Sequence, residues 1–102
     1  MYNVVYLPTA DRQLSDAIMY IARELGSPTA AEHLLDEVDR ICESLADLPY
    51  RYSLYPVTFA LKKEVRFVPV MNYILFYTVN EEEKTVEIWR FLHQRQDAGK
   101  QQ

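Results

Sequence analysis

The sequence predicts one α+β domain: a strand, an antiparallel helical hairpin and then a three-stranded antiparallel meander, with both helices packed on one face of the sheet. Two patterns favour this fold class. Two neighbouring segments carry apolar residues at helical spacing and are separated by a very short joint. The stretch from residue 64 to residue 97 contains three runs that are dense in β-branched and aromatic side chains and are separated by short turns.

The chain opens with a predicted strand, residues 2–7, which Pro8 ends. Thr9 is expected to be the N-cap of a helix that begins at Ala10, because a threonine hydroxyl can accept a hydrogen bond from a free N–H group of the first turn. The helix carries one apolar stripe with the i, i+3, i+4, i+7 spacing that predicts a buried face. Its members are Leu14, Ala17, Ile18, Ile21, Ala22 and Leu25.

The joint between the helices has residues typical of a helix end followed directly by a helix start. Gly26 is expected to close the first helix, Ser27 to be the N-cap of the second, and Pro28 to be its first residue. Leu48 and Pro49 end the second helix. Both apolar stripes must be buried against the sheet. The second stripe consists of Ala31, Leu34, Leu35, Val38, Ile41, Cys42 and Leu45.

The predicted strands of the meander cover residues 64–70, 73–79 and 85–93. Pro69 has no N–H group to donate to a neighbouring strand, so it is expected at a strand end or at an outward-facing edge position. The helical hairpin and the sheet together are expected to bury one set of residues. This set is Ile18, Ile21, Leu34, Val38, Ile41, Leu75 and Ile88.

Length and composition indicate one domain. The 102 residues suffice for a single core, and we expect residues 1–97 to form the domain and residues 98–102 a short polar tail. No apolar run approaches the roughly 20 residues of a membrane span, and the N-terminus lacks the pattern of a signal peptide. The single cysteine, Cys42, cannot form an internal disulfide. These features predict a cytoplasmic protein that does not associate with membranes.

The net charge of −4 divides unevenly along the chain. Residues 1–50 carry three basic and nine acidic side chains, which gives −6, and residues 51–102 carry eight basic and six acidic ones, which gives +2. The mildly basic second half can offer a surface to an anionic partner, although solvated charges on each face explain the split equally well. The positive charge is too small for binding that depends on many phosphate contacts.

Residues 50–63 form an irregular segment with aromatic side chains at Tyr50, Tyr52, Tyr55 and Phe59. Aromatic residues at this density are expected to pin the segment onto the core, with the hydroxyl groups reaching water. Because Arg and Lys residues are interspersed among them, stacking on nucleic acid bases is the alternative interpretation.

The sequence has no glycine-rich phosphate loop, no His/Cys set with metal-ligand spacing and no Ser/His/Asp arrangement, so neither a metal nor a cofactor is expected. One candidate for acid–base chemistry is His93, at the end of the last predicted strand. Arg90 and Arg95 lie nearby in the sequence and could hold a phosphodiester while the histidine transfers a proton. A histidine that is hydrogen-bonded to the backbone at a strand end is the alternative.

Four segments, in the right order, match a known family. Residues 2–10 are similar to its opening strand and helix entry, and residues 27–31 to its inter-helix Pro-x-Ala-Ala. Residues 65–77 are similar to a Val-Arg … Asn-Tyr-x-Ile-x-Tyr pattern, and residues 92–97 to a closing Leu-His-Gly-Arg-Arg-Asp. With this order of segments, nearly the whole chain resembles the RelE/ParE family of type II toxin–antitoxin toxins.

The resemblance implies a small cytoplasmic toxin that a cognate antitoxin neutralises. The family contains ribosome-dependent mRNA endonucleases and ParE-type proteins that poison DNA gyrase. Three departures favour the ParE type: Ile74 replaces an arginine usual in the nucleases, no aromatic residue follows His93, and the chain is acidic. We therefore expect a ParE-like toxin that acts by binding its target, with DNA gyrase as the implied target.

Two alternatives stay open. One is a ribosome-dependent endonuclease, acting on mRNA, in which His93, Arg95 and Arg66 would be the catalytic residues. Arg95 and His93 have counterparts at the nuclease site, whereas Arg66 matches the ParE-like motif. The other is a member of the family that has lost its toxicity.

The surface expected to contact the antitoxin or the target combines arginines with aromatic side chains, the residue types that dominate interface energetics. Which of Trp89 and Arg90 faces outward depends on a strand parity that the sequence leaves open. Asp16, on the acidic first helix, is expected to lie outside this surface. The surface comprises Arg66, Tyr73, Trp89, Arg90, His93 and Arg95.

Overall fold

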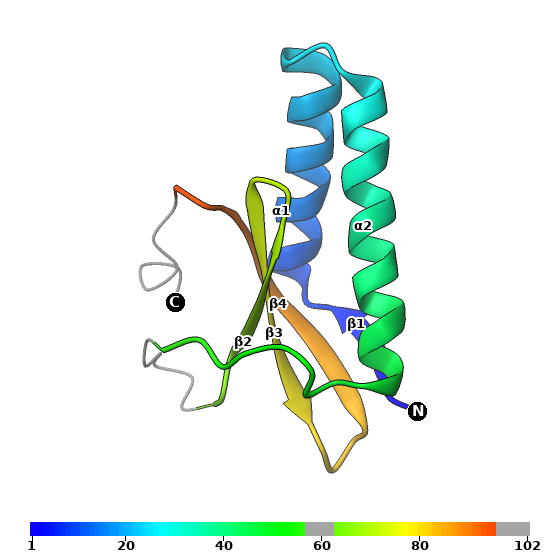
Figure 1. Ribbon diagram of the computed structural model, residues 1–102, viewed down its shortest axis with the longest axis vertical. Coiled ribbons are helices and arrows are strands. Elements are labelled where there is room, and N and C mark those ends of the chain that lie inside the picture. Colours follow the sequence, from blue (N-terminus) through cyan, green and yellow to red (C-terminus); the bar gives the residue numbers. More distant parts are fainter. Residues whose placement is uncertain (57–62, 96–102) are drawn as a thin grey trace.

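The computed structural model describes residues 1–56 and 63–95. The predicted elements occur in the predicted order, with two helices and four strands (Figure 1). The predicted polar tail and Phe59 lie outside the described residues. The elements are β1 (Asn3–Tyr6), α1 (Pro8–Met19), η1 (Tyr20–Glu24), α2 (Pro28–Asp47), β2 (Arg66–Val70), β3 (Tyr73–Asn80) and β4 (Thr85–His93).

The four strands form one mixed sheet in the order β1-β4-β3-β2. Strands β2, β3 and β4 pair antiparallel with their neighbours, while β1 pairs parallel with β4. The α+β class is therefore confirmed, but the prediction of a three-stranded antiparallel sheet is only partly right. A parallel neighbour needs a long crossover connection, which the helical hairpin supplies here. The strand pattern of residues 2–7 alone did not reveal that partner.

The first helix begins earlier than predicted. Pro8 is its first residue and Leu7 is its N-cap, with no side-chain hydrogen bond to the first turn, so the prediction of Thr9 as the cap was wrong. Proline fits the first helical position because its missing N–H group would have no partner there and its φ is already helical. The helix continues as a π-helical turn, η1, to Glu24.

The joint between the helices is as predicted. Gly26 has a φ of 61°, a left-handed conformation that favours glycine. The Ser27 side chain accepts a hydrogen bond from the backbone N–H group of Ala30 at 3.3 Å, and Pro28 opens α2. This geometry turns the chain back on itself, so α1 and α2 lie side by side and extend past the sheet (Figure 1).

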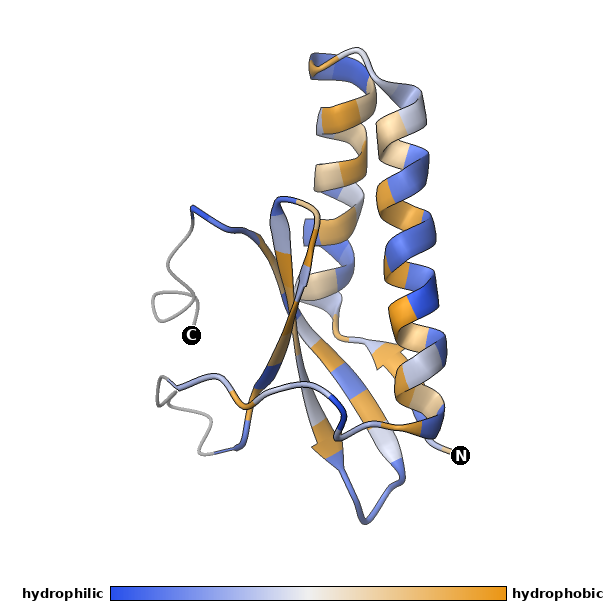
Figure 2. Ribbon diagram, viewed as in Figure 1, coloured by the Kyte–Doolittle hydropathy of each residue, from blue (hydrophilic) through white to orange (hydrophobic). Residues whose placement is uncertain are grey.

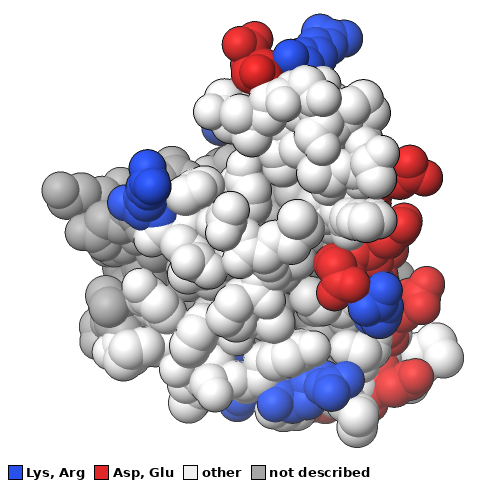
Figure 3. Space-filling view, turned by 45° about the horizontal axis from the view of Figure 1, so that its top comes forward, with Lys and Arg blue, Asp and Glu red and all other residues white. Residues whose placement is uncertain are grey.

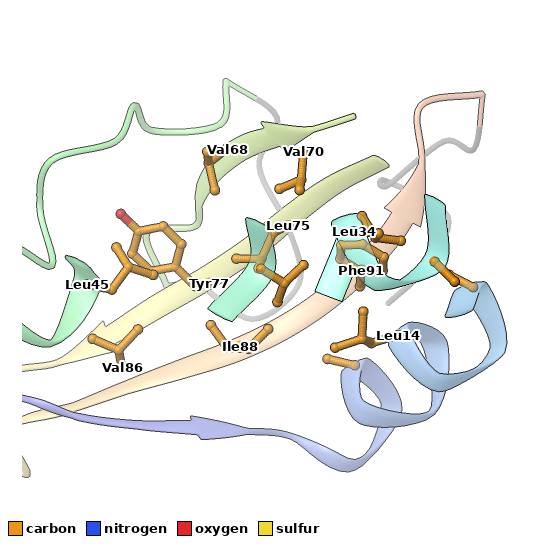
Figure 4. Packing of buried hydrophobic residues seen from close by; sticks show 14 of the residues in the cluster. Leu14, Leu34, Leu45, Val68, Val70, Leu75, Tyr77, Val86, Ile88 and Phe91 are labelled. Atoms are coloured by element: carbon orange, nitrogen blue, oxygen red, sulfur yellow. The ribbon is translucent and has the colours of Figure 1, made fainter. Parts of the chain in front are cut away.

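The core lies between the helical hairpin and one face of the sheet. The side of α2 that is turned towards α1 and the sheet is mostly apolar, and its opposite side is mostly polar (Figure 2). Leu34 of α2 and Leu14 of α1 lie over Phe91, and Leu45 lies beside Tyr77 at the other end of the same core (Figure 4). Five of the seven predicted core residues are buried. These are Ile21, Leu34, Val38, Leu75 and Ile88, whereas Ile18 and Ile41 are only partly buried against the core.

A second apolar cluster covers the other face of the sheet. Its buried members are Val65, Phe76, Trp89 and Leu92. Tyr55 closes it, with its ring edge-on to Phe76 at a centroid distance of 5.0 Å. At Tyr55 the prediction that aromatic residues pin the irregular segment onto the core is confirmed.

The outer edge of β2 is protected in two ways. Near its start, the Phe67 N–H group donates to the Ser53 carbonyl at 3.0 Å and the Tyr55 N–H group to the Val65 carbonyl at 2.7 Å. The Phe67 nitrogen thus points away from β3, and so does the Pro69 nitrogen two residues later. The exposed Pro69 therefore costs the sheet no hydrogen bond, as predicted, and gives a foreign strand no donor at this edge.

Leu34→Ala should lower the free energy of unfolding by about 2–5 kcal/mol, because Leu34 is completely buried and the substitution leaves a cavity. Leu35→Ala is the matched control. Leu35 is 40% exposed, so its loss should cost about 0.5 kcal/mol or less. Urea unfolding curves measure both values. Equal costs for the two variants would contradict the packing described here.

Candidate functional site

The six residues predicted to form one partner surface lie in three places. Arg66 pairs with Tyr77 across β2 and β3, whereas His93 pairs with Tyr73. Four positions of β3 separate these pairs, which is about 13 Å along the strand. The Trp89 side chain belongs to the second apolar cluster, on the face of the sheet that points away from the helices.

Three of the six, Tyr73, His93 and Arg95, come together in a groove that we call the terminal groove. It lies between α1, η1 and the place where the start of β3 pairs with the end of β4. It encloses about 530 Å³. Its lining residues are Gln13, Asp16, Ala17, Tyr20, Tyr73, Phe91, His93 and Arg95.

Aromatic contacts fix the floor of the terminal groove. The Tyr73 ring stacks on Phe91, with a centroid distance of 5.0 Å and an angle of 9° between the planes. His93 meets the same tyrosine edge-on at 5.3 Å. Burial, reinforced by the nearby Tyr20, raises the pKa of Tyr73, so this phenol stays protonated at neutral pH.

The backbone N–H group of Arg95 donates to Nδ1 of His93 at 3.2 Å. Nδ1 is the acceptor of this hydrogen bond, which leaves Nε2 as the ring nitrogen available for other contacts. This contact is the backbone hydrogen bond at a strand end that the sequence offered as the structural alternative for His93.

Gln13 fixes the helix that forms the other wall of the terminal groove. Strand β1 ends at Tyr6, and its last contact with β4 is the hydrogen bond from the Leu7 N–H group to the Ile88 carbonyl at 3.0 Å. Farther along the same edge, the Phe91 N–H group donates to Oε1 of Gln13 at 2.8 Å. A side chain of α1 thus replaces the missing strand, since an unpaired buried N–H group is costly.

The sequence analysis missed three lining residues, Gln13, Asp16 and Tyr20. Together with Ala17 they recur at i, i+3, i+4 and i+7, which places them on one side of the first helix. This mixed polar and aromatic stripe beside the apolar one was the available signal. Asp16, which was expected to lie outside the partner surface, lines the same groove as His93 and Arg95. Its part in partner binding stays a prediction.

Arg66 belongs to a different cluster, at the far end of the sheet. Its guanidinium donates to the Tyr52 carbonyl at 2.7 Å and lies 5.1 Å from the centroid of the Tyr50 ring. The Tyr50 hydroxyl in turn donates to Glu81 at 2.5 Å. Arg66 thereby holds the segment after α2 against the sheet and the turn between β3 and β4.

The Glu81 carboxylate is the centre of this cluster. It also accepts hydrogen bonds from the Tyr2 hydroxyl, at 2.7 Å and 2.8 Å, and from the Lys84 ammonium group. These donors, Lys84 first, lower the pKa of Glu81 to about 2. One side chain therefore links the start of the chain, the segment after α2 and the turn that joins β3 to β4.

A β-bulge decides how Trp89 and Arg90 are oriented. Phe76 pairs with Arg90 but the next residue, Tyr77, pairs with Ile88, so the register shifts by one residue at Trp89. Trp89 is 4% exposed, and the Arg90 guanidinium lies over its ring at 4.5 Å and donates to its carbonyl at 2.8 Å. The tryptophan is buried and the arginine partly exposed.

Acidic side chains gather along the side of the molecule on which α2 lies, and a broad area without charged side chains lies beside them (Figure 3). The exposed acidic residues of α2 are Glu32, Asp36, Asp39, Glu43 and Asp47.

No group of three His, Cys, Asp or Glu residues in the described ranges could hold a metal ion. Within the same ranges, none of the helices is long and apolar enough to cross a membrane.

Solved structures share this fold. The chromosomal ParDE toxin–antitoxin system of P. aeruginosa matches with a TM-score of 0.69 and 15% identity, over 91% of this chain and 96% of that one. The RelBE2 toxin–antitoxin complex of Mycobacterium tuberculosis matches with a TM-score of 0.61 and 25% identity, over 90% and 96%. The RelE-RelB complex of Pyrococcus horikoshii OT3 matches with 0.54 and 13%, over 94% and 98%.

The fold is thus that of the RelE and ParE toxins. A family model described as the ParE toxin of the type II toxin-antitoxin system parDE matches residues 4–98. A comparison with curated proteins found no significant match. Because the family model covers nearly the whole sequence, the chain belongs to the RelE/ParE family of type II toxins, as the resemblance of its motifs had indicated.

Stability should depend on Glu81 in a pH-dependent way. Its folded-state pKa of about 2 lies below its ordinary 4.5, so the charged carboxylate stabilises the fold. This contribution is complete above about pH 4.5 and is lost as the pH falls towards about 2. The difference in unfolding free energy between the wild type and Glu81→Gln should therefore shrink on acidification, as urea unfolding at a series of pH values would measure.

Glu82→Gln in the same turn is the matched control, since the Glu82 side chain takes part in none of the hydrogen bonds of this cluster. A difference that stays constant for Glu81→Gln between about pH 6 and pH 2 would show that the cluster does not form in solution.

Proposed function

We propose that this protein is the toxin of a type II toxin–antitoxin pair, that it acts by binding its target rather than by cutting RNA, and that a cognate antitoxin protein neutralises it. The match of the ParE family model to residues 4–98 carries this proposal. An antitoxin partner is supported by the similar structures, since the RelBE2 and RelE-RelB structures are toxin–antitoxin complexes. We propose DNA gyrase as the target, because ParE-type proteins of this family poison that enzyme.

The placement of the three candidate nuclease residues supports binding over catalysis. Cleavage of RNA at a phosphate requires an acid, a base and fixed cations within hydrogen-bonding reach of one group. Arg66 lies about 13 Å along the sheet from His93 and is engaged by Tyr52 and Tyr50. Ile74, at the position of an arginine in the nucleases, packs against the second apolar cluster.

The terminal groove favours the second candidate, an endonuclease. It brings a histidine, an arginine and two tyrosines to one groove of about 530 Å³. With Arg66 absent from this set, the nuclease would depend on His93 and Arg95 alone for its base and its cation. The two candidates therefore make opposite predictions for these residues.

Expression of the wild-type protein without an antitoxin should stop growth, and the purified protein should inhibit DNA supercoiling by gyrase while leaving mRNA on translating ribosomes intact. The His93→Ala variant should likewise leave the mRNA intact. Cleavage of mRNA that His93→Ala abolishes would establish the endonuclease instead. Normal growth of the expressing cells would identify a family member without toxicity.

Arg95→Glu should weaken antitoxin binding or toxicity by about tenfold or more, because arginine contacts are frequent hot spots and the reversed charge opposes the same partner. Titration calorimetry with the antitoxin and growth assays measure the two effects. Arg40→Glu is the matched control, since Arg40 is exposed on α2 and, within the described residues, forms an ion pair with Glu37 of its own helix. Unchanged affinity and unchanged toxicity in Arg95→Glu would remove the terminal groove from the functional surface.

A further inference from the structure

Strand β1 forms one edge of the sheet, and β2 forms the other (Figure 1). The Asn3 N–H group donates to the Lys84 carbonyl at 2.9 Å, and the Leu7 N–H group donates to the Ile88 carbonyl at 3.0 Å. The backbone N–H and C=O groups of successive residues point to opposite sides of a strand. The odd-numbered residues of β1 therefore direct these groups towards β4, and the even-numbered residues direct them away from it.

The backbone groups that point away from β4 belong to Tyr2, Val4 and Tyr6. The Tyr2 N–H group donates to the Ala46 carbonyl of α2 at 2.7 Å, which agrees with this direction. Within the described residues, no strand lies beside Val4 and Tyr6 on this side. Their N–H and C=O groups thus form an open edge, and an open edge is a template on which another strand can pair.

The edge of β1 lacks the protection that the edge of β2 has. Pro69 interrupts the donors of β2, whereas Asn3–Tyr6 contains neither a proline nor a charged residue. With its flanking residues the segment reads Tyr-Asn-Val-Val-Tyr-Leu over residues 2–7. High β-propensity without charge or proline is the composition of segments that pair with copies of themselves. A second copy of this chain therefore supplies a strand that suits the edge.

We propose that β1 pairs antiparallel with β1 of a second copy of the chain, with Val5 of one copy opposite Val5 of the other. In this register Val4 of each copy and Tyr6 of the other exchange both of their backbone hydrogen bonds. The contact is two-fold symmetric, so the same groups are satisfied in both copies. It joins the two four-stranded sheets into one continuous sheet.

The helical hairpins add apolar area to this short strand pairing. The two-fold axis of an antiparallel strand pair runs perpendicular to the sheet, so the hairpins of both copies lie on the same face. A groove of about 490 Å³ begins at the open edge, since Tyr6 lines it together with Ile18, Met19 and Leu35. Met19 and Leu35 are exposed in the single chain. The hairpin of the second copy can cover them, and this burial stabilises the pair.

Charge opposes the association, since each copy carries a net charge of −4 and the exposed side of α2 is acidic. Salt screens this repulsion, so the dimer should become tighter as the salt concentration rises. Docking of a basic partner would respond in the opposite way. The strand contact is short, which predicts a weak and reversible dimer. The proposal does not depend on the proposed function, because toxic and non-toxic proteins alike can associate through this edge.

Sedimentation equilibrium of the purified chain alone should show a monomer–dimer equilibrium that shifts towards the dimer as the protein or the salt concentration rises. Amide hydrogen exchange followed by NMR then identifies the edge. The N–H groups of Val4 and Tyr6 should become protected as the protein concentration rises, whereas that of Val5, which points to β4, should be protected throughout. A monomer at every concentration, or a dimer in which Val4 and Tyr6 stay unprotected, overturns the proposal.

Val4→Pro should weaken the dimer by about tenfold or more, because symmetry removes two hydrogen bonds at once. The lost N–H group points away from β4, so the sheet itself loses no hydrogen bond. Val4→Ala is the matched control: it also loses the packing of the valine side chain but keeps the N–H group, and it should associate like the wild type. Near-UV circular dichroism checks the fold of both variants. Equal association of Val4→Pro and Val4→Ala contradicts the proposal.

Val5→Cys tests the register and leaves the outward backbone groups in place. Directly opposite residues of an antiparallel pair have Cβ atoms about 5 Å apart, within reach of a disulfide after a small adjustment. Air oxidation should therefore link two copies of Val5→Cys. The wild type, which has only Cys42, and Asn3→Cys, which lies opposite Leu7 of the second copy, should stay unlinked on a non-reducing gel. No link in Val5→Cys, or equal linking in Asn3→Cys, would show that the register is wrong.

The same exchange measurement recognises a foreign strand at this edge. If Val4 and Tyr6 become protected only when another protein is added, and the chain alone stays monomeric, the edge receives a strand of that protein and the self-pairing proposal fails. The toxicity assay is separate: growth arrest by a chain that stays monomeric would support the proposed function while overturning this inference.

Discussion

The β-bulge in β4 is the feature on which the rest of the structure depends. An uninterrupted strand would place residues 88 and 91 on opposite faces of the sheet. The extra residue opposite Phe76 and Tyr77 resets the alternation, so Ile88 and Phe91 both face the helices. Trp89 and Leu92 face the other way and form the second cluster. One irregular position thus gives the sheet two apolar faces.

The same irregularity separates the candidate sites. Because Phe91 faces the helices, Tyr73 can stack on it and His93 can meet Tyr73 in the terminal groove. Because Trp89 faces the other side, Arg90 lies over its ring on that side of the sheet. Two groups of basic and aromatic side chains that are close in sequence therefore end on opposite faces of the sheet. Arg66 lies in a third place, where its hydrogen bond to the Tyr52 carbonyl holds the segment after α2 against the sheet.

Charge is distributed in a way that suits a protein partner. The exposed residues of α2 are largely acidic, whereas Arg95 lies in the terminal groove and Arg90 lies over Trp89 on the other side of the sheet. An extended chain with a few acidic and apolar side chains can contact such scattered sites one after another, which a rigid partner cannot. This distribution agrees with the antitoxin partner proposed for this member of the toxin family.

The sequence by itself determined the order of the elements, the joint at Gly26, Ser27 and Pro28, the edge position of Pro69 and the family. These features follow from local properties: periodicity, backbone conformations that particular residues favour, and a missing N–H group. Only the tertiary structure decided the parallel pairing of β1, the orientation of Trp89 and the grouping of Asp16 with His93. Each of these depends on which distant segments meet, and neither strand partners nor a bulge leave a periodic mark in the local sequence.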